Sequence, residues 1–151
     1  LVGSEMCIRD SDGSIIRACF KFHKNILLQE SLLYWPAPII ISEEEVDELG
    51  IREAVNMYFS DEDSRNKKAI MRSPLRFDFD PSNTSDLHPA THVHMQHADC
   101  RISAKRPICF NTFIKFVFKN FYPNCCPSIL DDLKRLNYSG FDIFDKAVIC
   151  L

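Results

Sequence analysis

Residues 69 to 80 read Ala-Ile-Met-Arg-Ser-Pro-Leu-Arg-Phe-Asp-Phe-Asp, and the alternation in this stretch decides the fold. Apolar side chains recur at every second position, which is the period of a β-strand with one face toward a core. We therefore predict a strand over Ala69 to Asp80. Its apolar face carries Met71, Leu75, Phe77 and Phe79, and its polar face carries Arg72, Arg76, Asp78 and Asp80.

Further strands are predicted on both sides of this stretch. Ser14 to Phe22 shows the same alternation, and a short polar segment separates it from the apolar run Ile26 to Trp35. This arrangement is typical of a β-hairpin. After a polar loop, Thr91 to Gln96 predicts a second strand next to the first motif, and Arg101 to Ser103 a short extended piece.

A Phe-rich helix is predicted over Asn111 to Tyr122, where Pro123 ends it. Aromatic and aliphatic residues recur there at intervals of three and four, which favours one buried helix face. Packing in a core explains this spacing better than stacking on single-stranded nucleic acid does. The residues of this face are Phe113, Ile114, Val117, Phe118 and Phe121.

The remaining helical signals are shorter. Ser42 to Glu45 has the spacing of a capping box and predicts a helix start, which Gly50 interrupts before a second piece over Ile51 to Phe59. We expect a solvated loop at Ser60 to Asp63 and a short helix within Ser128 to Leu136. The expected fold class is α+β, with an antiparallel sheet of the hairpin and the two motif strands packed against the Phe-rich helix.

The first ten residues, LVGSEMCIRD, resemble a translated sequencing-library adapter of the transposase type. The adapter leaves two bases that complete Ser11 with one further base. We therefore expect residues 1–11 to be an adapter-derived artefact, and segments of this kind are excluded from fold reasoning. Residues 12–151 are then expected to form a single α+β domain that is truncated at its N-terminus.

Composition excludes some classes of function. The formal net charge is −3, and without Glu5, Arg9 and Asp10 it becomes −2. A chain so close to neutral lacks the single-sign field of general nucleic-acid or membrane-surface binders. No run approaches the roughly 18 apolar residues of a membrane span. The six cysteines beyond the adapter form no CxxC pair, which indicates reduced thiols.

An ordered series of motifs carries a family resemblance. The motifs are Arg76 to Pro81, His88-Pro89 with His92, Cys100 to Ile102, Phe113 to Phe116 and Asn120 to Tyr122. Together they resemble domain of unknown function 2290 (DUF2290), a family of mostly bacterial, uncharacterised proteins. The resemblance implies an intracellular, cytoplasmic α+β protein and brings no activity. The sequence departs from the family pattern at Cys109-Phe110, where the resemblance implies a Thr or Ser helix cap followed by proline. Loss of such a cap costs about 1 kcal/mol of helix stability.

Four histidines fall within ten residues, at positions 88, 92, 94 and 97. In a strand, His92 and His94 project from the same face. If this strand pairs with Ala69 to Asp80, the polar face with Arg76 and Asp78 lies beside the two imidazoles. We select His92, His94 and Asp78 as candidate ligands of a divalent metal ion such as zinc, with Arg76 as a further candidate catalytic residue.

Three interpretations of this face stay open. Metal-assisted hydrolysis of a phosphodiester is one, and proton transfer by a histidine with Arg76 or Arg101 steadying negative charge is another. The pattern alone favours the third, an ordinary solvent-exposed strand face with local ion pairs. His88 is expected to be a loop residue. The competing functions are thus a small hydrolase or nuclease and a module whose polar sheet face, or a region before residue 12, docks a protein partner.

Overall fold

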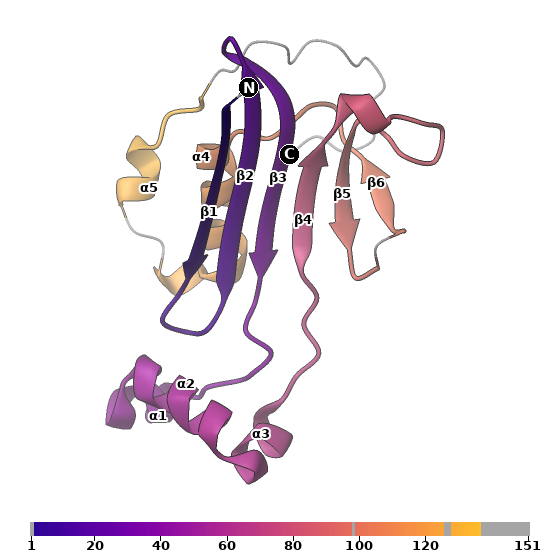
Figure 1. Ribbon diagram of the computed structural model, residues 1–151. Helices are drawn as coiled ribbons and strands as arrows, with labels where there is room; N and C mark the ends of the chain where they lie inside the picture. The colour runs from indigo at the N-terminus through magenta and orange to yellow at the C-terminus, as the bar shows by residue number, and fades with distance from the viewer. Residues whose placement is uncertain (1, 98, 126–127, 137–151) are drawn as a thin grey trace.

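The computed structural model describes residues 2–97, 99–125 and 128–136 of the chain. Its centre is a six-stranded antiparallel sheet whose strands lie side by side in chain order (Figure 1). Neighbours in sequence are therefore neighbours in space. The strands are β1 (Val2–Arg9), β2 (Ile15–His23), β3 (Ile26–Trp35), β4 (Leu75–Phe79), β5 (Thr91–Met95) and β6 (Arg101–Ser103).

The main core lies between one face of the sheet and helix α4 (Phe110–Phe121). Phe113 and Val117 are fully buried, and they belong to the same cluster as the inward-facing side chains of β2 to β5. This confirms the predicted α+β class and the packing of the sheet on the Phe-rich helix. The sheet residues of the core are Ala18, Leu32, Tyr34, Phe77 and Val93.

The predicted hairpin is also confirmed. His23 pairs with Ile26, so Lys24 and Asn25 alone make the turn. Both have positive φ angles, 45° and 66°. Two successive residues of this kind form the type I′ turn, whose twist matches that of antiparallel strands.

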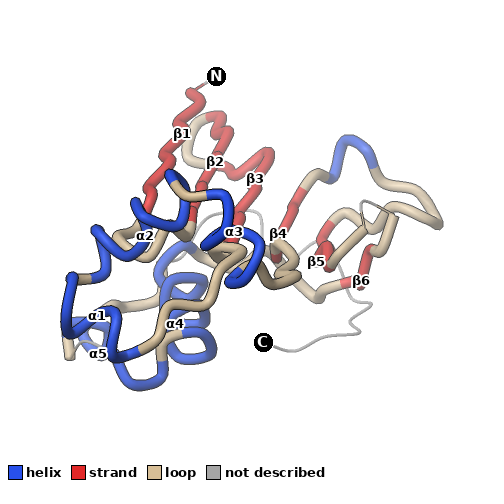
Figure 2. The backbone as a smooth tube through the Cα atoms, turned by 90° about the horizontal axis from the view of Figure 1, so that it is seen from below, coloured by secondary structure: helices blue, strands red, loops and turns tan. Residues whose placement is uncertain are grey.

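Three helices are inserted between β3 and β4 and lie at one end of the sheet (Figures 1 and 2). They are α1 (Glu43–Leu49), α2 (Ile51–Ser60) and α3 (Glu62–Lys68). Ser42 and Glu45 form the predicted capping box, and Gly50 separates α1 from α2 as expected. A second, smaller core supports this insertion, made of Ala37, Ile39, Val55 and Tyr58.

Two local predictions are wrong. The strand predicted over Ala69 to Asp80 is confined to Leu75–Phe79, because Pro74 has no N–H to donate to a ladder. Met71, assigned to the core face, is fully exposed. The expected loop at Ser60 to Asp63 instead contains the start of α3, where acids in the first turn and bases in the last turn favour the helix dipole.

The chain after the sheet contains shorter elements. Helix α4 begins at Phe110 with Cys109 as N-cap, and this cap makes no side-chain hydrogen bond. Of the helix expected within Ser128 to Leu136, only α5 (Ile129–Asp132) is present. Single 3-10 turns occupy Pro81–Asn83 and Pro123–Cys125.

Residues 2–9, which belong to the adapter-like segment, form the edge strand β1. It pairs antiparallel with β2 from Val2 opposite Phe22 to Arg9 opposite Ile15. The side chains of residues 3–11 are all exposed. The strand is thus held by its backbone and contributes no buried side chain among residues 3–11.

Candidate metal centre

The site lies on the sheet face opposite α4, where β4 and β5 pair. Asp78 stands directly across from His92, and Arg76 across from His94. On the outer sides of this pair, β3 places Ser31 opposite Asp78 and β6 places Arg101 opposite His94. The pairing anticipated from the sequence is therefore present, and it brings the three candidate ligands together.

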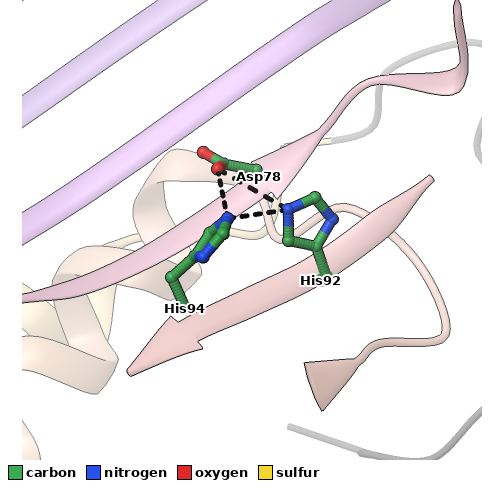
Figure 3. Close-up of side chains that lie close together, drawn as sticks. All are labelled: Asp78, His92 and His94. Carbon is green, nitrogen blue, oxygen red and sulfur yellow. Dashed lines mark hydrogen bonds and ion pairs between the residues drawn. The ribbon is translucent and has the colours of Figure 1, made fainter. Parts of the chain in front are cut away.

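The ligand atoms of Asp78, His92 and His94 point toward one another (Figure 3). The two histidine Nε2 atoms are 2.9 Å apart. Asp78 Oδ2 lies 3.3 Å from Nε2 of His94 and 3.7 Å from Nε2 of His92. Zinc–nitrogen bonds of about 2.0 to 2.1 Å at a tetrahedral angle imply ligand separations of about 3.3 Å. The three distances bracket this value.

Both imidazoles are buried, which separates this site from an ordinary solvent-exposed face. His92 is 1% exposed and His94 7%. Burial is the main cause that lowers the pKa of His92, against the carbonyl of Pro89 and the charge of Asp78, which raise it. Burial and then the Arg76 charge lower the pKa of His94. Both rings are therefore neutral at neutral pH, the form in which imidazole binds metal.

Hydrogen bonds from outside the triad hold two of the three candidate ligands, His92 and Asp78, in place. Nδ1 of His92 lies 2.6 Å from the carbonyl oxygen of Pro89, so this nitrogen carries the proton and Nε2 presents its lone pair to the site. Ser31 donates to Asp78 Oδ1 at 2.7 Å. Arg76 Nε donates to Asp78 Oδ2, also at 2.7 Å. Arg76 thus orients a candidate ligand.

A depression of about 690 Å³ opens over this face. A cavity of this size is within the range of small-molecule and cofactor sites. Its lining combines the triad with residues from β1 to β6, so the whole width of the sheet contributes. The basic side chains in the lining are Arg17, Lys21, Arg76 and Arg101.

Some of these residues were missed or misjudged by sequence reasoning. His88 lies in the loop before β5, as expected, but its place at the site was missed: it lines the depression, and its ring packs edge-on against His92 with 4.6 Å between centroids. Ser31 carries no signal of its own, because only the β3–β4 register places it beside Asp78. His97, counted in the histidine cluster, has a side chain 76% exposed and is absent from the lining.

The fold and this face define an α+β protein with a candidate metal centre on the open side of an antiparallel sheet. The chain belongs to the family described as Uncharacterized conserved protein (DUF2290), whose model matches residues 8–148. No activity is established for the chain by this membership. Searches of the curated proteins and of the solved structures found no match. None of the helices within the described residues is long and apolar enough to cross a membrane.

Proposed function

We propose that the chain is a metal-dependent hydrolase that binds a divalent transition ion such as zinc through His92, His94 and Asp78 and cleaves phosphodiesters. The observation that carries the proposal is the convergence of two Nε2 atoms and one carboxylate oxygen at separations of 2.9 to 3.7 Å. Imidazole and carboxylate are ligands that zinc accepts, and three protein ligands leave a fourth position for water or substrate.

The buried histidine pair also supports a functional interpretation. Two imidazoles placed nitrogen to nitrogen lose hydration, and only one of them can donate a proton to the other. Nδ1 of His94 is buried without a hydrogen-bond partner among the described residues. Buried polar groups without hydrogen-bond partners lower stability, and in native proteins such groups are typical of sites that bind an ion or take part in catalysis.

The reaction follows from what such an ion supplies. His92, His94 and Asp78 would hold the zinc ion, which would lower the pKa of a bound water toward neutrality and so supply a hydroxide nucleophile. The water oxygen forms a bond to phosphorus, and the bond from phosphorus to the leaving oxygen breaks. The leaving oxygen takes up the proton that the water lost when it became hydroxide. The products are a phosphomonoester and an alcohol. Basic side chains in the depression suit the negative charge of the phosphate.

The test is metal analysis of the purified protein after incubation with zinc and dialysis, together with hydrolysis of single-stranded and duplex DNA. The wild-type protein is expected to retain about one zinc ion per chain, coordinated tetrahedrally by the three side chains and a water molecule. The double variant His92→Ala, His94→Ala removes two of the three ligands and should lose both zinc and hydrolysis.

His97→Ala is the matched control, because this histidine is exposed and lies outside the depression. It should keep the zinc and the activity of the wild-type protein. Equal zinc content in the double variant and the wild type would refute the metal site. Hydrolysis by a metal-free wild-type protein would refute metal dependence and favour proton transfer by histidine instead.

We also propose that the protein acts in the bacterial cytoplasm, as the family resemblance implies. Among the described residues, the thiols of Cys19, Cys100 and Cys109 are free. Unpaired cysteines suit a reducing compartment. The origin of residues 1–11 as an adapter-derived artefact likewise stays a proposal.

A further inference from the structure

Arg101 is a basic side chain of the depression that lies next to the triad and makes no hydrogen bond to it. It lies on β6, directly across from His94 on β5. Its side chain lines the same depression as His92 and His94. The guanidinium group is thus near the two candidate ligands without contacting either in a hydrogen bond.

The hydrogen bonds of Arg101 are incomplete. Its Nε is buried and has no hydrogen-bond partner within the part of the chain that the structure describes. Its one ion pair with another described residue is a long contact of 3.6 Å from Nη1 to Asp99, whose side chain is 78% exposed. A pair of this kind contributes little. A buried N–H without an acceptor is unfavourable, so a bound ligand that supplies the acceptor is favoured.

Arg76 differs from Arg101 in this respect. Nε of Arg76 already donates to Asp78 Oδ2 at 2.7 Å, so this group serves to position a candidate metal ligand. Nε of Arg101 has no acceptor among the described residues, and together with one Nη it forms an edge of the guanidinium fork. This edge matches two oxygens of a phosphate group in a bidentate contact.

The geometry points to an anion subsite at Arg101 that binds the phosphate group of the substrate beside His92 and His94. This inference rests on the proposed function, because it assigns the substrate contact of the same site. The lining of the depression also holds Arg17 and Lys21 of β2, together with the acidic residues Glu5 and Asp80. Phosphate is the shared chemistry of a free ion, a terminal monoester and an internal diester.

The experiment measures the binding of two probes to zinc-incubated protein by calorimetry. The probes are inorganic phosphate and a single-stranded oligodeoxynucleotide without terminal phosphates. Arg101→Gln should weaken phosphate binding about tenfold to a hundredfold, because it removes a charge-assisted bidentate contact. Arg101→Lys keeps the charge but loses the fork, and it should recover only part of the affinity.

Arg106→Gln is the matched control, since Arg106 is exposed and absent from the lining of the depression. It should bind phosphate as the wild-type protein does. Zinc content measured on the same samples separates the two proposals: wild-type zinc with lost phosphate binding locates the defect at Arg101. If Arg101→Gln does not fold, the Arg101→Lys variant provides the comparison.

Unchanged phosphate affinity in a folded Arg101 variant would overturn the subsite, and so would a zinc-bound wild-type protein that binds neither probe. Loss of oligonucleotide binding together with phosphate binding would support an internal diester. Loss of phosphate binding alone would support the subsite for a free or terminal phosphate.

Discussion

Glu30 is a carboxyl group on the core side of the sheet. It is 2% exposed and belongs to the face of β3 that also carries Leu32, which packs toward α4. Burial raises its pKa to about 9, although the backbone N–H of Ile108 acts in the opposite direction. The nearby Cys109 and Asp78 raise it further. Glu30 is therefore protonated in the folded protein at neutral pH.

This residue should make stability depend on pH in the direction opposite to that of a salt-bridged acid. Between about pH 4.5 and pH 9 the folded state holds a proton that the unfolded state releases, so stability falls as pH rises through this window. The slope is about 1.4 kcal/mol per pH unit. Glu30→Gln should remove this slope, measured by urea unfolding at pH 5.5 and pH 7.5.

Glu48→Gln serves as the comparison, because Glu48 is exposed on α1. The unfolding free energy of the Glu48→Gln variant should change with pH as that of the wild-type protein does. A Glu30→Gln variant with the wild-type pH dependence would show that Glu30 is ionised in the folded protein.

At the candidate site, strand alternation predicted which side chains lie on the same face of the sheet. His92, His94 and Asp78 share a face because of the period of two, and one pairing assumption places them together. The separate tasks of Arg76 and Arg101 did not follow from the pattern. Which arginine is already hydrogen-bonded depends on side-chain geometry across three strands.

At the scale of elements, β1 is an edge strand of the sheet that pairs with β2. Its side chains are exposed over residues 3–9. Their contacts include a 3.8 Å pair from Glu5 to Arg17 and the guanidinium group of Arg9 over the ring of Phe59. The stabilisation from its backbone hydrogen bonds to β2 is largely offset by the conformational entropy lost when eight residues become ordered.

A chain that begins at Asp12 should therefore fold normally. Its melting temperature should change by less than about 4 °C, equivalent to about 1 kcal/mol for a protein of this size. Its zinc content should match that of the longer chain. Circular dichroism during heating provides the measurement.

A chain with residues 1–11 in shuffled order is the control for this deletion and should melt like the shortened chain. Loss of cooperative unfolding after the deletion would show that β1 is an integral strand of the fold. It would also argue against an adapter origin of the segment.

Element boundaries illustrate why local patterns predict the existence of an element better than its ends. The alternation over residues 69 to 80 predicts a strand, yet Pro74 limits it to Leu75–Phe79. Residues 69–74 instead form the return from the helical insertion, where Ala69 makes a single bridge to Ile39. Pairing partners, and not the pattern itself, decide where the ladder stops.

On the scale of the whole molecule, α4 holds the sheet together from the side opposite the candidate site. Phe113 is fully buried and meets the ring of Phe77 edge-on at 5.9 Å between centroids. Phe77 lies between Arg76 and Asp78 on β4 and points to the other face. Packing on α4 therefore fixes the strand that carries the Asp78 ligand.

Phe113→Ala should destabilise the protein by about 3 to 5 kcal/mol, because it leaves a cavity at the centre of this core. Phe121→Ala, on the same helix but 43% exposed, should cost less than about 2 kcal/mol. Urea unfolding measures both. Similar losses for the two variants would contradict the placement of the core at Phe113.

The sequence by itself determined the class of fold, the hairpin, the Phe-rich helix and the three candidate ligands, because each depends on local periodicity or capping chemistry. Only the tertiary structure decided that the two histidines are buried, that Arg76 donates to Asp78 and that Nε of Arg101 has no acceptor among the described residues. Burial and hydrogen-bond partners depend on which strands become neighbours. That register pairs residues up to 49 positions apart, such as Glu30 and Phe79, and no local pattern encodes it.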